Sequence, residues 1–379
     1  MSSASGTGGG GGRAVAVGRD FPSRLHSLTG LRFWAALLVV MYHLSAQVGE
    51  VPVLSYLTAF GRTGVTFFFV LSGFVLAWTY LDRPVGFGVF MWRRFARLWP
   101  LVAATGAISL AIYWWIDELP GVWESATTFL FLQAWHPLWE DGANPASWSL
   151  SDEAFFYLLF PALLAIAAAG RRWRGALWVG CGVVLLGLWW VFGTVGWEGF
   201  WLDYFPPSRL VQFVIGVLCA VVVRRGGRSP VGYWPAVVLV VAFHAAMVPW
   251  ERVSGGEAGF GPYSGSQWWS TPVFALLIVA AAQHDIDGRA TLVRDRVSIR
   301  LGAWSYAWYL VHEPVIRAWN HVVPDGLGLT SPGVGVALEW VALLALSQAA
   351  AWALYSLVEH PAERWLRARG TQPVVPRGG

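Results

Sequence analysis

The sequence predicts an all-α fold, a polytopic membrane helical bundle with about ten transmembrane helices. Of the 379 residues, 56% are hydrophobic and 13% are charged, whereas a soluble domain carries roughly 25% charged residues. Apolar runs of about 20 residues, the length that crosses a bilayer, recur along the chain. The pI of 9.3 comes from arginines in short loops, so we expect no nucleic-acid partner and a chain surrounded by membrane lipid.

A Gly/Ser-rich tail opens the chain, and the apolar runs follow it. Residues 1–27 lack the apolar core of a secretory signal and are predicted to be disordered, as are residues 369–379. Residues 28–368 form the predicted transmembrane domain. We expect its spans at 31–48, 64–81, 99–116, 148–169, 175–193, 208–225, 231–249, 268–284, 301–320 and 335–357. The shorter stretch 122–135 contains Glu124 and is predicted to be an interfacial or re-entrant piece.

The arginines predict the orientation of these spans, because cytoplasmic loops collect basic residues. With the N-terminus inside, 22 arginines fall on the cytoplasmic side and 4 on the other, alternating loop by loop. Both termini are therefore predicted to be cytoplasmic. All 26 basic residues are Arg, which indicates a GC-rich genome. We expect a multi-pass protein of a bacterial plasma membrane.

The two cysteines, Cys181 and Cys219, both lie within predicted spans. Their spacing predicts neither a disulfide framework nor a metal site. We therefore expect no bound metal.

Arg32 and His43 interrupt the first apolar run, LRFWAALLVVMYHLSAQV. On a helix they share one face, roughly 16 Å apart along its axis. Ionisable groups inside a membrane are costly and commonly serve function, which makes both residues site candidates. The alternative is a snorkelling Arg and a hydrogen-bonded core His.

Further polar residues are predicted in the outer half of the membrane, at the level of His43. On the fourth span, Glu153 shares a face with Ser149 and Tyr157 at four-residue spacing. On the ninth span, His312 and its neighbour Glu313 reach a similar level. These groups predict either an acid/base cluster with His43 and Glu153 as catalytic residues, or hydrogen-bonded packing.

The opposite surface carries an arginine group before the third span, in MWRRFARLWP. Arg93 and Arg97 share a face at four-residue spacing and lie at the same membrane surface as Arg32. Guanidinium groups bind phosphates through charged bidentate contacts, so these three arginines are candidates for binding a phosphorylated co-substrate. Arginines that merely hold topology are the alternative.

Several motifs, in order, resemble those of the integral-membrane acyltransferase family 3. They are Arg32-x10-His43, GVTFFFVLSGF at 64–74, RRFARLWP at 93–100 and PASWSLSDEAFFYLLFP at 145–161, with looser matches LGAWSYAWYLVHEPV at 301–315 and LVEHPAERWL at 357–366. The resemblance implies transfer of an acyl group, acetyl or another short chain, from acyl-CoA to a hydroxyl. The implied acceptor is an envelope glycan or a glycosylated metabolite such as a macrolide. The family's arginine and histidine match Arg32 and His43, and its carboxylate matches Glu153. The resemblance also implies acyl-CoA as co-substrate and no bound cofactor.

The resulting hypothesis joins the two levels of the membrane. Arg32, Arg93 and Arg97 hold the CoA phosphates, and His43 deprotonates the acceptor hydroxyl, oriented or charge-stabilised by Glu153. A proton-coupled exporter of a glycoside or lipid is the alternative, since buried His and Glu also suit proton coupling. The sequence shows no inverted repeat, and it leaves the oligomeric state open.

Overall fold

The computed structural model describes residues 21–52, 54, 58–195, 199–254, 262–324, 326–327 and 332–370, and these residues form helices without a strand. The helices are α1 (His26–Gln47), α3 (Thr63–Tyr80), α4 (Phe87–Trp115), α5 (Val122–Phe129), α6 (Trp148–Ala168), α7 (Arg171–Val195), α8 (Phe200–Asp203), α9 (Pro206–Arg224), α10 (Tyr233–Ser254), α11 (Pro262–Ile286), α12 (Arg296–Val322), α13 (Pro332–Leu354) and α14 (His360–Gly370). Short 3-10 turns at Gln133–Trp135, Pro137–Trp139 and Pro145–Ser147 lead into α6. The predicted all-α class is confirmed.

Each predicted span overlaps one long helix of the described chain, and six helices are long and apolar enough to cross a membrane. These six are His26–Gln47, Thr63–Tyr80, Phe87–Trp115, Pro145–Ala168, Phe200–Arg224 and Gly333–Gly370. A shorter apolar helix covers Tyr233–Met247. The number of about ten crossings and the cytoplasmic position of both termini stay predictions.

Several predicted boundaries were wrong. The third helix begins at Phe87 rather than at residue 99, so the arginine-rich segment that was predicted to precede it is the first part of α4. The helix continues through it because its arginines and aromatic residues are compatible with helical geometry. α1 begins at His26 and α14 ends at Gly370, each two residues from the predicted domain limits of 28 and 368, which stay predictions. Most of both predicted tails, residues 1–20 and 371–379, lies outside the described residues.

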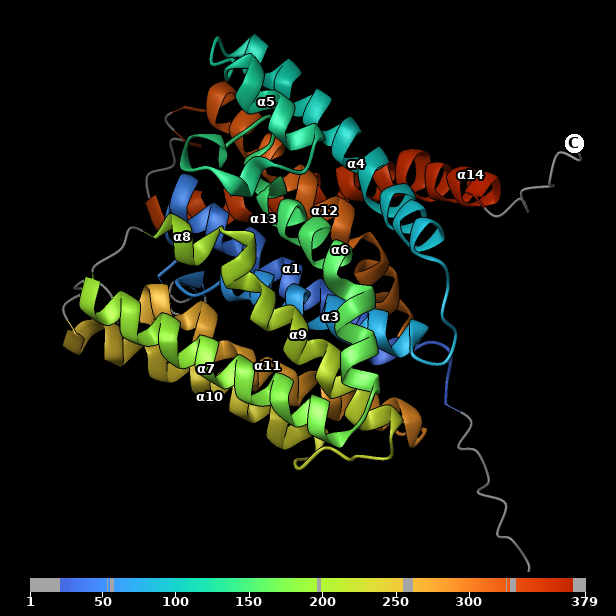
Figure 1. Cartoon of the computed structure of the whole chain (residues 1–379). Coiled ribbons are helices and arrows are strands. Elements are labelled where there is room, and N and C mark those ends of the chain that lie inside the picture. Colours follow the sequence, from blue (N-terminus) through green and yellow to red (C-terminus); the bar gives the residue numbers. More distant parts are fainter. Residues whose placement is uncertain are drawn as a thin grey trace, which may run out of the picture.

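Helices α1 and α12 run parallel and pack tightly, as do α3 and α9 (Figure 1). A Cβ at Gly302 of α12 would overlap the Thr29 carbonyl of α1, and a Cβ at Gly216 of α9 would overlap the Val70 carbonyl of α3. Glycine at such contacts lets helix backbones approach closely inside a membrane. Further along the first pair, the Phe33 ring stacks on the Trp308 ring at 5.5 Å between centroids.

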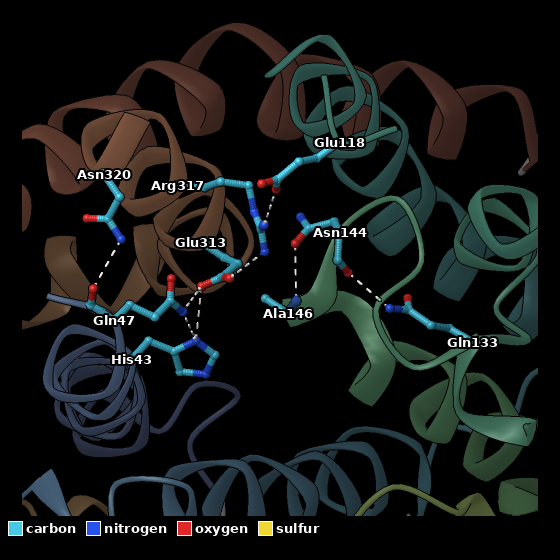
Figure 2. A network of polar contacts seen from close by, with 9 residues as sticks. All are labelled: His43, Gln47, Glu118, Gln133, Asn144, Ala146, Glu313, Arg317 and Asn320. Carbon is cyan, nitrogen blue, oxygen red and sulfur yellow. Dashed lines mark hydrogen bonds and ion pairs between the residues drawn. The ribbon is translucent and has the colours of Figure 1, made fainter. Parts of the chain in front are cut away.

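The segment between α4 and α6 is closed onto the end of the bundle by side-chain hydrogen bonds (Figure 2). Gln133 Nε2 donates to the Asn144 carbonyl at 3.1 Å, and Ser147 Oγ donates to Gln133 Oε1 at 2.7 Å. Asn144 Nδ2 in turn donates to the Leu310 carbonyl of α12 at 2.8 Å. The start of α6 is thereby fixed against α12.

Helix α14 continues α13 through one π-helical turn, Tyr355–Glu359, and lies along the first half of α4 (Figure 1). Trp92 Nε1 donates to the Leu366 carbonyl at 2.8 Å. A π turn inserts an extra residue and changes which side chains face inward. Here it buries Glu359, which is 1% exposed, whereas α14 has no buried residue.

The α1–α12 contact predicts a position-specific cost for added volume. Gly302→Ala should lower the free energy of unfolding by about 1–3 kcal/mol, because its methyl group meets backbone that cannot move aside. Gly187→Ala on α7 is the matched control, since a Cβ there meets no atom of the described residues within 4 Å. Thermal unfolding of the purified proteins in detergent measures both changes. Equal stability of the two variants would contradict the prediction.

Candidate active site

An imidazole–carboxylate pair joins α1 to α12 (Figure 2). His43 Nδ1 lies 3.1 Å from Glu313 Oε2, and Gln47 Nε2 donates to the same oxygen at 2.7 Å. Arg317 lies 3.4 Å from the other carboxylate oxygen of Glu313. Because an ionised carboxylate only accepts hydrogen bonds, this arrangement favours the His43 tautomer with the proton on Nδ1 and a free lone pair on Nε2.

His312 completes the group from the position next to Glu313. Its ring meets the His43 ring edge-on at 4.9 Å between centroids, and its Nδ1 lies 3.2 Å from the Trp308 carbonyl. His312 is fully buried, and its Nε2 has no hydrogen-bond partner among the described residues. The structure thus brings together both predicted histidines.

The same three side chains offer ligand atoms within 4.8 Å of one another, a spacing that could hold a metal ion. Glu313 already accepts from Gln47 and lies beside the Arg317 guanidinium, which opposes a cation there. The expectation of no bound metal, made from the sequence, stays a prediction.

His43 faces a cavity of about 270 Å³, which we call the histidine cavity. Its polar lining includes His43, Gln47, Arg62, Glu140, Gln267, Glu313 and Arg317, and its rings are Tyr42, Trp148, Tyr204 and Tyr309. Asp203 accepts from Arg62 at 2.9 Å and from Gln267 at 3.0 Å, so these two wall residues are held in place. Burial and the neighbouring Asp141 raise the pKa of Glu140 in the segment before α6.

A second cavity, of about 370 Å³, is lined by Arg24, Arg32, Arg94 and Arg97, with Glu153 and Tyr157, and we call it the arginine cavity. The Arg94 guanidinium lies over the rings of Phe90 at 5.7 Å and Tyr157 at 6.0 Å, which direct it inward. The Nε atoms of Arg32 and Arg94 are buried without a hydrogen-bond partner in the described part of the chain. Buried N–H groups of this kind are costly unless a ligand or water accepts from them. The cavity is therefore suited to an anion.

Arg97 is held from the side by the C-terminal helices. Its NH1 donates to Glu359 and, at 3.0 Å, to Glu363, and its guanidinium lies 5.5 Å over the Tyr306 ring. The π turn before α14 places Glu359 in this contact. Two carboxylates thus fix Arg97 at the cavity wall.

The structure separates two predicted site residues from their expected partners. Glu153 accepts from Tyr157 at 2.6 Å and lines the arginine cavity, whereas the carboxylate on His43 is Glu313. Glu153 does not line the histidine cavity, because α6 turns its Glu153 side chain toward the arginine cavity. The arginine beside Arg97 in the lining is Arg94, not Arg93. Both spacings to Arg97, three and four residues, share a helix face, and packing on aromatic rings selects Arg94.

The two cavities adjoin at two residues. Val65 of α3 and Tyr309 of α12 line both of them, and Ser149, which lines the arginine cavity, lies 2.9 Å from the Tyr309 hydroxyl. A cavity suited to an anion and the cavity of the imidazole–carboxylate pair therefore lie next to each other, with Val65 and Tyr309 between them.

Sequence reasoning assigned no role to Glu313, Arg94 or Tyr309. Signals for the first two were present: Glu313 is adjacent to His312 on one span, and Arg94 precedes Arg97 by three residues. Tyr309 lies one turn before His312 on the same span, but its place between two cavities could not be predicted, because it depends on how α3, α6 and α12 pack.

This arrangement defines a helical membrane protein with groups suited to proton transfer and to anion binding on either side of a buried junction. Residues 25–356 match a family described as an acyltransferase domain. The chain therefore belongs to the integral-membrane acyltransferase family 3, as its motifs predicted, and it is an acyltransferase.

Related proteins agree with this membership. Acyltransferase MdmB of Streptomyces mycarofaciens is 34% identical over 392 residues, covering 93% of this chain and 95% of MdmB. A putative O-acetyltransferase of Staphylococcus aureus (strain COL) is 24% identical over 79% of this chain, which spans 52% of that relative. Protein 2 in the picA locus of Rhizobium radiobacter is 36% identical over 40% of this chain and 83% of its own length. No solved structure matches.

The two ion pairs of Arg97 predict that replacing Glu359 and replacing Glu363 destabilise the protein by unequal amounts. Glu359→Ala should lower the free energy of unfolding by roughly 3 kcal/mol, the low end for breaking a buried pair, because Arg97 is 23% exposed. Glu363→Ala should cost less, because Glu363 is the more exposed partner at 17% against 1%. Thermal unfolding in detergent compares the variants, and a larger loss for Glu363→Ala would contradict this order.

Proposed function

We propose that this protein is a membrane O-acyltransferase that moves a short acyl group, acetyl or another short chain, from acyl-CoA to a hydroxyl of a carbohydrate or glycosylated metabolite. The observation that carries the proposal is the junction of two unlike cavities at Val65 and Tyr309. One cavity presents guanidinium groups to an anionic donor. The other presents His43 and Glu313 to a neutral hydroxyl.

The arginine cavity is the proposed site of the CoA phosphates. Arg32 and Arg94 have buried Nε–H groups with no acceptor in the described chain, and guanidinium groups bind phosphate through charge-assisted contacts. Arg97 adds a third charge whose orientation is fixed by Glu359. The predicted orientation opens this cavity to the cytoplasm, where acyl-CoA is present. A pantetheine arm can span the roughly 16 Å of helical rise from Arg32 to His43.

His43 is the proposed general base. Its Nδ1–H donates to Glu313, which leaves Nε2 to take the proton of the acceptor hydroxyl. The carboxylate fixes the tautomer and stabilises the imidazolium that forms, while Gln47 and Arg317 hold the carboxylate. This geometry favours Glu313, rather than Glu153, as the group that orients the base.

The acceptor class rests on the motif resemblance and on the lining of the histidine cavity. Tyr42, Trp148 and Tyr204 offer ring faces, and Arg62, Glu140 and Gln267 offer polar groups, a combination that suits sugar rings and their hydroxyls. MdmB is named an acyltransferase and the Staphylococcus aureus relative a putative O-acetyltransferase, and the second name supports transfer to oxygen. An envelope glycan and a macrolide-type glycoside are the acceptors to test, with the enzyme in the plasma membrane of a GC-rich bacterium.

Product mass spectrometry tests the proposal directly. Purified protein in liposomes is supplied with isotope-labelled acetyl-CoA, propionyl-CoA or isovaleryl-CoA and a panel of glycosides. We expect a labelled ester and free CoA in stoichiometric amounts. Movement of an unmodified glycoside across the membrane without ester would instead support an exporter.

The base and its carboxylate predict effects on kcat. His43→Ala should lower kcat by about 10²–10⁴-fold, the usual contribution of a general base. Glu313→Gln should lower kcat by on the order of 10²-fold at an unchanged KM for acyl-CoA, because the arginines that bind this co-substrate are intact. Initial rates in membranes with matched protein levels measure both. Full activity of Glu313→Gln alongside an inactive Glu153→Gln would restore Glu153 as the orienting carboxylate.

Replacing arginines of the arginine cavity should change the KM for acyl-CoA. The neighbours Arg94 and Arg93 provide a variant and its matched control. Arg94→Ala should raise the KM for acyl-CoA roughly ten- to a hundred-fold, since a lost charge-assisted contact costs about 1.5–3 kcal/mol. Arg94→Lys should rescue only in part, because the planar fork is lost. Arg93→Ala should leave KM near wild type, because Arg93 lies outside the cavity lining. The reverse pattern would return the predicted role to Arg93.

A further inference from the structure

Tyr309 is placed where the two cavities adjoin. It lines both of them, is 6% exposed, and sits on α12 one turn before the His312–Glu313 pair. Val65 shares this position from α3, but its side chain has no hydrogen-bond donor. The Tyr309 hydroxyl is thus the side-chain donor that both cavities share in the described part of the chain.

Acyl transfer needs a donor at this place. When a hydroxyl attacks a thioester, the carbonyl oxygen becomes an oxyanion, and a positioned N–H or O–H must stabilise the charge as it develops. In the proposed function the thioester arrives from the arginine cavity and the acceptor from the histidine cavity. The reacting carbonyl then lies at the junction between them.

We propose that the Tyr309 hydroxyl is a catalytic residue that donates a hydrogen bond to the oxyanion of the tetrahedral intermediate. The inference rests on the proposed function and adds to it a residue to which the sequence assigned no role. In the step, His43 Nε2 takes the acceptor's proton and the acceptor oxygen forms a bond to the acyl carbon. The C=O electron pair moves onto the oxygen that Tyr309 faces. Collapse of the intermediate breaks the C–S bond, and the CoA thiolate takes the proton from His43.

The hydrogen bonds of the neighbouring tyrosines support the choice of Tyr309. Of the three tyrosines that line the arginine cavity, Tyr157 donates to Glu153 at 2.6 Å and Tyr306 donates to the Leu98 carbonyl at 3.0 Å. Carboxylate and carbonyl oxygens only accept, so both of these hydroxyl protons are committed.

Tyr309 has a different kind of partner, the Ser149 hydroxyl at 2.9 Å, which can donate as well as accept. When Ser149 donates to the Tyr309 oxygen, the phenolic proton is free for the substrate, and the incoming hydrogen bond strengthens the outgoing one. Ser149 is then a positioning residue for Tyr309. The sequence had predicted Ser149 as part of the site because it shares a helix face with Glu153.

Substitution of Tyr309 by Phe tests the proposal, with Tyr233→Phe as the matched control. Tyr233 is equally buried, at 3% exposure, and lies on α10 outside both cavity linings. We expect Tyr309→Phe to lower kcat by about 10²–10³-fold, the usual effect of losing one oxyanion donor, with KM for acyl-CoA within two-fold of wild type. The control should retain wild-type kcat, and Ser149→Ala should give an intermediate loss.

A second measurement separates chemistry from packing. Fluorinated tyrosines placed at position 309 keep the ring but make the phenol more acidic, so kcat should change progressively with phenol acidity. A structural role predicts no such trend, and predicts that Tyr309→Phe loses activity only in proportion to folded protein. Either result would overturn the proposal.

The wild-type enzyme, assayed alongside, distinguishes this failure from failure of the proposed function. Wild-type ester formation with full kcat in Tyr309→Phe removes Tyr309 alone from the chemistry. Absence of ester formation by wild type with every donor and acceptor tested would overturn both.

Discussion

The close parallel contact of α1 with α12 is the constraint on which the rest of the site depends. Gly302 lets the two backbones approach at Thr29, and the stacked rings of Phe33 and Trp308 keep the same register further along. That register brings the His43 ring to 4.9 Å from the His312 ring. An imidazole and a carboxylate from segments far apart in sequence can then share a hydrogen bond inside a helical bundle.

Buried charge is arranged in two ways in this molecule. At Arg97 and at Arg62, carboxylates from other helices accompany the guanidinium groups, which limits the cost of removing a charge from water. At Arg32 and Arg94, by contrast, buried Nε–H groups have no acceptor within the described chain. Other arginines, Arg224 and Arg317 among them, also have a buried Nε–H without an acceptor in the described chain, and Arg32 and Arg94 are the ones of this kind that line the arginine cavity.

The fold class followed from the sequence, because apolar runs of membrane length and the spacing of arginines are local properties of the chain. Helix ends were less predictable: α4 begins before the apolar run, since Arg93 and Arg97 extend the helix without adding to its hydropathy. For the site, the sequence pointed to Arg32, His43 and His312, residues that are unusual inside a membrane. In the structure Arg32 lines the arginine cavity, His43 lines the histidine cavity, and the His312 ring contacts the His43 ring.

By itself the sequence determined the class of protein and the family. It also indicated candidate site residues, because ionisable side chains inside apolar spans are costly to bury. Only the tertiary structure decided which of them meet. Glu313 rather than Glu153 contacts His43, and Arg94 rather than Arg93 lines the cavity, because these choices depend on which way each helix is turned and how far it is shifted. Helix rotation and depth are set by contacts between segments distant in sequence, such as Gly302 on Thr29, and residue spacing within one segment carries no information about them.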